Sequence, residues 1–184
     1  MSFNNARDHL ILNELYVQAC RALLSAYGLT VTVQEQGGGP GGGHKASYVS
    51  VLGASGEGIS LSSMLKIERD LVIRMHPVGS ANVTQPDVED WCLELNNQLV
   101  GRVKNKLLGY GPAVLVGLPV LLKGTDVSAV AGPNSEVHQY SVESAEGQIT
   151  LTLSTLIAAG VELHEMEPSM NDGAVLIEGA VALF

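Results

Sequence analysis

Two stretches of this sequence, LILNELYVQACRALLSAYGLTVTV (residues 10–33) and LELNNQLVGRVKNKLLGYGPAVLV (residues 93–116), align with each other without a gap. Nine of the 24 aligned positions hold the same residue, whereas chance gives roughly one or two matches between segments of such biased composition. Each stretch begins with apolar residues close to helical spacing and ends with an alternating apolar pattern. The repeat therefore predicts that a helix followed by a strand occurs twice in the chain.

Two predicted hairpins continue the repeat. Residues 47–52 and 59–65 read as paired strands, as do residues 137–144 and 148–154, and the segment GEGISLS of the first hairpin resembles EGQITLT of the second. A single copy is too small and too rich in strands to close its own hydrophobic core. We therefore predict one α+β domain over residues 1–184, with a mostly antiparallel sheet, two long helices packed on it, and a pseudo-twofold helix–strand–hairpin unit duplicated at about 7–76 and 86–158.

The two helices have recognisable ends. The first is predicted over residues 7–27 and stops at Gly28, a residue common just past helix C-termini. The second is predicted to begin after Thr84, with a proline in the first turn and an acid three residues on, and to end near Leu108. The other patterned segments predict strands at 29–33, 70–76, 113–122 and 174–184, and a flexible glycine-rich loop at 37–43.

Composition excludes several classes of protein. The chain is 46% hydrophobic and 16% charged, so it is expected to fold, and its apolar runs are far shorter than the ~18–20 residues of a membrane helix. The formal charge of −9 argues against a nucleic-acid partner. Residues 124–184 carry acids and no Lys or Arg, which fits either a solvated surface or a basic partner. The first residues show no secretory signal, and the two cysteines lack the spacing of a disulfide or metal site. We therefore expect a cytoplasmic protein.

The second helix has two faces. At 100° per residue, its apolar residues cluster on one side, while the other side carries Glu94, Asn97, Gln98, Gly101 and Lys104. A glycine inside a helix costs about 0.5–1 kcal/mol relative to alanine. On an exposed face this cost has an obvious reason if a second molecule approaches the helix closely. The polar face is therefore a candidate interaction surface.

Asn96 differs from the residues around it, because it points to the apolar side of the helix, as does its repeat counterpart Asn13. Buried amides are normally hydrogen-bonded to backbone groups. We therefore predict that Asn13 and Asn96 are structural residues buried at matched sites.

The second helix and the segment that follows it resemble a known family. ELNNQLVGRVKNKL (94–107) is similar to the pattern E-x-x-N-x-x-x-G-x-x-K-x-x-L of the CheC/CheX chemotaxis phosphatases, and GLPVLLKG (117–124) resembles the Leu-Pro strand that follows that helix. In the first repeat, Ile11 and Glu14 stand where the second has Glu94 and Asn97. A single E-x-x-N site resembles CheX more than CheC, which commonly carries two.

The resemblance implies an enzyme that acts on a phosphorylated CheY-like receiver. The receiver would supply its own aspartyl phosphate and Mg²⁺, so the chain needs no cofactor or metal of its own. Asn97 would orient the attacking water, Glu94 would pair with the receiver's active-site lysine, and Gln98, Gly101 and Lys104 would contact the partner. A neutral amide aligns water without repelling the phosphate, and phosphoryl transfer depends mainly on such positioning. A homodimer is also implied.

Three alternatives remain open from the sequence. The chain could be a non-catalytic binding module, similar to the flagellar switch proteins; the polar helix face could be merely solvated; and the target could be a receiver outside chemotaxis. Other chemistries have weaker support, because GGGPGGGHKAS lacks the G-K-[S/T] of a phosphate-binding loop and the five histidines show no metal-site spacing.

Overall fold

A computed structural model describes residues 3–30, 32–36, 47–79, 82–124, 127, 132–144 and 147–166. The predicted glycine-rich loop at 37–43 and the predicted strand at 174–184 lie outside the described residues.

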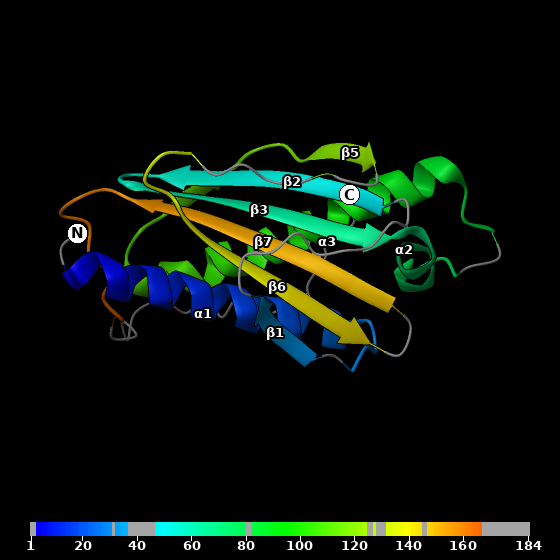
Figure 1. Cartoon of the computed structure of the whole chain (residues 1–184), viewed down its shortest axis with the longest axis horizontal. Coiled ribbons are helices and arrows are strands. Elements are labelled where there is room, and N and C mark those ends of the chain that lie inside the picture. Colours follow the sequence, from blue (N-terminus) through cyan, green and yellow to red (C-terminus); the bar gives the residue numbers. More distant parts are fainter. Residues whose placement is uncertain are drawn as a thin grey trace, which may run out of the picture.

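One antiparallel sheet forms the centre of the molecule, with the helices beside it (Figure 1). Its strands are β1 (Thr32–Gln36), β2 (Ser47–Gly56), β3 (Ile59–Glu68), β4 (Val114–Val116), β5 (Val120–Gly124), β6 (Glu136–Ser144) and β7 (Gly147–Ile157). The helices are α1 (Phe3–Ala26), α2 (Arg69–Met75), α3 (Gln85–Leu107) and the short 3-10 helix η2 (Leu108–Tyr110). The predicted α+β class, the antiparallel sheet and both hairpins are confirmed.

The order of the strands joins the two predicted repeats into one sheet. The order is β1-β6-β7-β3-β2-β4, with β5 also paired to β2, and the two hairpins meet where β3 pairs with β7. The lone strand β1 of the first repeat pairs with the second hairpin, while β4 and β5 pair with the first hairpin. Each repeat therefore completes the sheet of the other. Superposition of the two halves, with their predicted boundaries, stays a prediction.

The ends of both long helices follow their local sequence. Thr84 caps α3: its side chain accepts a hydrogen bond from the backbone N–H of Asp87, and the Asp87 carboxylate accepts one from the backbone N–H of Thr84 at 2.7 Å. Such a capping box satisfies backbone donors that the first turn leaves unpaired. At the end of α1, Gly28 has a φ of +72° and the backbone N–H of Leu29 donates to the carbonyl of Leu24. The predicted start of α3 and end of α1 are both confirmed.

Two predicted strands are wrong in type or position. Residues 70–75 lie in α2, where Leu71, Val72 and Met75 are buried, and His76 caps its C-terminus. These positions lie on one side of a helix, but Leu71, Ile73 and Met75 also alternate as in a strand, so the sequence fits both structures. The strand predicted at 29–33 begins only at Thr32. Leu29 belongs instead to the C-terminal turn of α1, where its side chain is buried and its backbone N–H bonds to Leu24.

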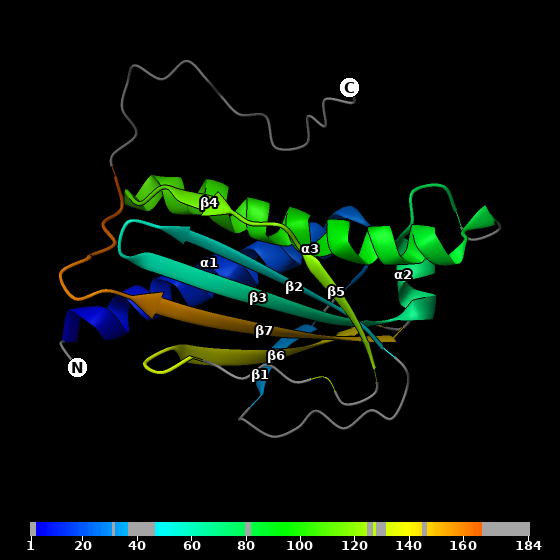
Figure 2. The same cartoon turned by 90° about the horizontal axis from the view of Figure 1, so that it is seen from above.

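Helices α1 and α3 pack on the same face of the sheet (Figures 1 and 2), where both reach Ser63 of β3. Asn96 of α3 is fully buried; its amide donates to the backbone carbonyls of Ser50 at 2.9 Å and Ser63 at 3.2 Å, and its oxygen accepts from the Ser63 hydroxyl at 2.7 Å. The Tyr16 hydroxyl of α1 lies 2.7 Å from the same serine oxygen. The structural role predicted for Asn96 is confirmed.

The matching prediction for Asn13 is wrong. Asn13 is only half-buried, and its side-chain oxygen has no hydrogen-bond partner among the described residues. The reason is that α1 reaches Ser63 through Tyr16, almost one helical turn beyond Asn13. The two asparagines are aligned in the sequence but do not occupy equivalent polar sites.

Candidate functional site

The polar face predicted for α3 lies along its outer side. Asn97 is exposed, whereas Glu94, Gln98, Gly101 and Lys104 are half-buried. The opposite side is packed into the core through Val88, Cys92, Leu95, Asn96, Leu99, Val100, Val103 and Leu107. Because one face is fully committed to the core, the direction in which the outer residues point is set by the packing of the whole helix.

Glu94 and Asn97 form a hydrogen-bonded pair. The side-chain amide of Asn97 donates to Glu94 Oε2 at 3.3 Å, the contact expected of residues three positions apart on a helix. Both residues lie in the interior of α3, away from its ends. Side chains carried by a packed helix are held more precisely than side chains on a loop. The pair presents an amide and a carboxylate together at the surface.

Gln98 is held on both sides within the chain. Its Nε2 donates to Glu94 Oε1 at 2.9 Å, and its Oε1 accepts from the hydroxyl of Tyr27 at 2.8 Å. Tyr27 follows directly after α1, so the first helix supports the polar face of the second. Burial raises the pKa of Tyr27, and the nearby Glu94 charge raises it further, so the phenol stays protonated.

Sequence reasoning missed Tyr27 as a part of this site. Its ring packs edge-on against Trp91, with the two ring centroids 5.7 Å apart, and the ring of His76 lies 5.4 Å from the same Trp91 ring. The only sequence signal was that Tyr27 is one of the identical positions of the repeat, paired with Tyr110. That signal does not show that the end of α1 meets the interior of α3.

Within the described part of the chain, nothing in the packing requires a glycine at Gly101. A Cβ atom built at this position meets nothing within 4 Å. Since the helix loses stability by having glycine here, the open space above Gly101 is consistent with close approach by another molecule. Lys104 lies about one turn further along the same face.

The outer face of α1 has a different set of groups. Ile11 is half-buried and Glu14 is exposed, and Glu14 Oε1 accepts a hydrogen bond from Gln18 Nε2 at 3.2 Å. The positions aligned with Glu94 and Asn97 therefore hold an apolar residue and an acid, and not an acid and an amide. The described part of the chain thus holds one E-x-x-N arrangement, on α3.

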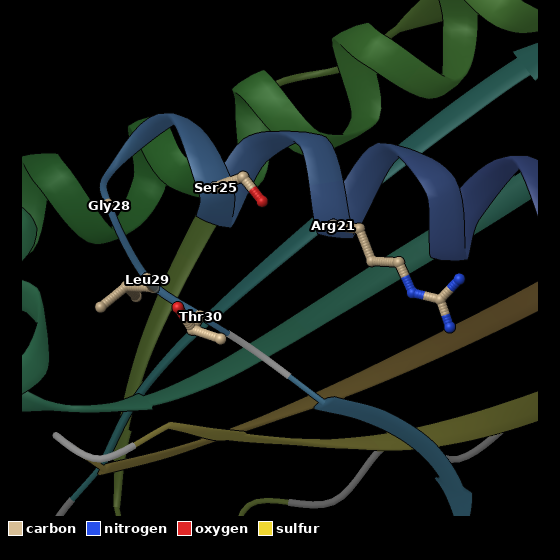
Figure 3. A pocket seen from close by; sticks show the side chains of 5 residues that line it. All are labelled: Arg21, Ser25, Gly28, Leu29 and Thr30. Atoms are coloured by element: carbon tan, nitrogen blue, oxygen red, sulfur yellow. The ribbon is translucent and has the colours of Figure 1, made fainter.

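Other candidate sites have little support. Among the described residues, no group of three or more His, Cys, Asp or Glu side chains is arranged to hold a metal ion, and no helix is long and apolar enough to span a membrane. A shallow pocket at the end of α1 is lined by Arg21, Ser25, Gly28, Leu29 and Thr30 (Figure 3). The Arg21 side chain extends away from Ser25 and Thr30, so these polar groups do not converge on one ligand.

The fold is found in solved structures of chemotaxis proteins. No protein-family model matches the sequence, and no curated protein matches it either. CheX from Vibrio vulnificus superposes with a TM-score of 0.68 at 14% identity, covering 78% of this chain and 98% of that one. CheX from Borrelia burgdorferi, solved in a CheX–CheY–BeF3–Mg complex, gives a TM-score of 0.58 at 12% identity over 78% and 96% of the two chains. The FliM middle domain from H. pylori gives 0.52 at 10% identity over 85% and 94%.

These neighbours agree with the resemblance carried by the α3 motif, although identities of this size establish only the fold. Coverage of nearly the whole length of each neighbour means that the similarity is not confined to one hairpin or helix pair. The chain has the fold of the CheX and CheC-like chemotaxis proteins.

Proposed function

We propose that this protein accelerates the dephosphorylation of a CheY-like receiver domain that carries an aspartyl phosphate. The observation that supports this most directly is the Glu94–Asn97 pair, held at the surface of a rigid helix beside a glycine that leaves room for a partner. A protein of this fold is known in complex with CheY, beryllofluoride and magnesium. In our proposal the same kind of partner docks on the polar face of α3.

In this proposal Asn97 orients the attacking water and Glu94 binds a cation of the receiver. Hydrolysis of an acyl phosphate requires a water placed in line with the bond that breaks, and an uncharged amide does this without repelling the phosphoryl oxygens. The phosphoryl group and its Mg²⁺ belong to the receiver, so we expect this chain to need no cofactor of its own. Gln98, Gly101 and Lys104 are proposed to lie at or beside the contact.

A second candidate is a non-catalytic scaffold that binds a partner through the same fold. The shared fold of the FliM middle domain from H. pylori supports it. The two functions differ in one measurable respect: a scaffold binds a receiver without changing the lifetime of its phosphate.

Self-association is a further expectation that stays a proposal. Strands β4 and β5 both pair with β2 near one edge of the sheet, and Leu115, Leu118, Val120 and Leu122 are exposed along them. Exposed apolar residues at a sheet edge favour pairing with a second chain. Light scattering across a concentration series would detect a dimer.

We also propose a cytoplasmic location, which suits two free buried cysteines.

The decisive experiment is a panel of receiver domains charged with acetyl phosphate, with phosphate release followed with and without this protein. The proposal expects a protein-dependent acceleration for at least one receiver. Binding to the same receivers activated with beryllofluoride should be measured in parallel. Binding without acceleration would select the scaffold, and neither binding nor acceleration would refute both functions.

A further inference from the structure

Which group donates and which accepts is fixed in the hydrogen bonds around Glu94. An ionised carboxylate only accepts, so Gln98 must turn its NH2 group toward Glu94 and its oxygen away from it. The Gln98 oxygen then faces Tyr27, and the phenol must donate to it. The orientation of the glutamine amide is therefore set from both ends, by the charge on Glu94 and by the single proton of the Tyr27 hydroxyl.

The two oxygens of Glu94 consequently have different roles. Oε1 is occupied by Gln98 at 2.9 Å, while Oε2 accepts the longer, solvent-exposed bond from Asn97 at 3.3 Å. A cation arriving from solvent competes more easily for Oε2, because the bond it replaces is weaker and more accessible. Replacing that bond also frees the Asn97 amide.

We propose that Tyr27 is a positioning residue for the α3 site, acting through Gln98 to hold Glu94 so that a partner's cation takes Oε2 and thereby releases Asn97. This inference rests on the proposed function, and it adds a residue from the first repeat to a site carried by the second. Gln98 then acts mainly inside the chain, as the link between Tyr27 and Glu94, rather than as a contact to the partner.

Tyr27 is well suited to this role because it is itself held in place. Its backbone N–H donates to the carbonyl of Leu24 at 3.1 Å, which continues the C-terminal turn of α1. Its ring lies edge-on to Trp91 of α3 with an interplanar angle of 88°. A donor whose position is fixed before the partner arrives lowers the entropic cost of ordering Glu94 on docking.

The test compares Tyr27→Phe with the wild type in the receiver assay. Phenylalanine keeps the ring on Trp91 and removes only the hydroxyl, so the fold should be retained. We expect KM for the phosphorylated receiver, and Kd for the beryllofluoride-activated receiver, to rise about 3–10-fold. The kcat at saturation should stay within about twofold, because the docked complex holds Glu94 through the partner's cation.

Gln98→Leu is a second variant with the same expected result, and the double variant should be no worse than either single one, because the two residues act in series. Tyr48→Phe is the matched control. The Tyr48 hydroxyl also bonds a glutamine of α3, accepting from Gln85 Nε2, but at the far N-terminal end of the helix. Its loss should leave KM and kcat unchanged.

The outcomes separate this inference from the function on which it rests. Unchanged KM and Kd in both Tyr27→Phe and Gln98→Leu would overturn the positioning role while leaving the phosphatase proposal intact. A fall in kcat with unchanged KM would overturn it as well, since Tyr27 would then act on the chemical step. Additive losses in the double variant would show that the residues act independently. Failure of the wild type to bind or dephosphorylate any receiver would refute the function itself.

Discussion

Helices α1 and α3 come from aligned stretches of the sequence and cover the same face of one sheet, yet their outer faces carry different chemistry. On α3 the Glu94 carboxylate accepts from Asn97, three positions on, beside an open glycine, whereas on α1 Ile11 stands in the place of Glu94 and Glu14 accepts from Gln18, four positions on. Packing constrains the inner residues of both helices, because each must fit the sheet. The outer residues are free of that constraint, so function is to be sought in what differs there.

The inner faces also differ in one respect. Asn96 is bonded to β2 and β3, while the oxygen of Asn13 lacks a partner among the described residues. Similar sequences on two helices thus do not guarantee similar hydrogen bonds. The difference between the helices can be tested with paired substitutions, one on each helix.

The largest expected effect is at Asn97. Replacing it with alanine should lower kcat for receiver dephosphorylation by about 10²-fold, the usual cost of removing one group that positions reacting atoms. Glu14→Ala on α1 should change nothing, because Glu14 occupies the aligned position but has no part in the proposed site. Phosphate release measured at saturating receiver checks both. Full activity of Asn97→Ala would mean that the water is oriented elsewhere.

Asn96→Ala should destabilise the fold by about 2 kcal/mol, because the buried groups of Ser50 on β2 and Ser63 on β3 then lose their hydrogen-bond partner. Asn13→Ala should change the free energy of unfolding by less than about 0.5 kcal/mol, because the Asn13 oxygen makes no hydrogen bond to the described residues and alanine favours helix. Urea unfolding followed by circular dichroism measures both values. Equal losses at the two positions would contradict the asymmetry between the helices.

Glu94→Gln keeps the shape of the side chain and removes its charge. We expect KM to rise about 10-fold, near 1.4 kcal/mol, with a smaller loss in kcat, because the partner's cation then lacks its counter-charge. Titration of the receiver against each variant separates KM from kcat, with Glu14→Gln as the control on α1. If Glu94→Gln bound normally but turned over as slowly as Asn97→Ala, Glu94 would belong to the chemical step.

Gly101→Ala should have opposite effects on stability and on docking. The added methyl meets none of the described residues within 4 Å, so the helix should gain about 0.5–1 kcal/mol of stability. The same methyl should weaken receiver binding a few-fold if the partner approaches the backbone there. Gln18→Ala, at the aligned position of α1, should leave binding unchanged. Unchanged affinity of Gly101→Ala would mean that the partner does not reach this turn.

The two buried cysteines, one on each helix, should react equally slowly with thiol reagents. Burial raises the pKa of Cys20 on α1 and of Cys92 on α3 from 9.0 to about 12. The protonated thiols contribute their full stability below about pH 9, and this is lost as the pH rises toward 12, because only the unfolded chain ionises readily in that window. Iodoacetamide should therefore label both slowly at pH 8 in folded Cys20→Ser and Cys92→Ser variants, and quickly in urea. Fast labelling of one native thiol would show that its helix opens locally.

Local sequence rules predicted α3 correctly. The cap at Thr84, the apolar stripe and the buried Asn96 depend on residues within a few positions of one another or on the side of the helix that faces the core. The hairpins were predicted for the same reason, since alternation and short turns are local signals. The segment 70–76 was mispredicted because seven residues are too few to distinguish the helical period of 3.6 residues from the strand period of two.

The sequence by itself determined the α+β class, the two long helices, the hairpins and the motif that places Glu94, Asn97 and Gly101 on one helix face. Only the tertiary structure decided that β1 completes the sheet of the other repeat and that Tyr27 meets Gln98, 71 positions away. The physical reason is the distance along the sequence over which each interaction acts. Helix periodicity and capping depend on neighbours in the chain, whereas the support of the polar face depends on where the end of α1 packs against α3, which is settled by the fit of both helices to the shared sheet.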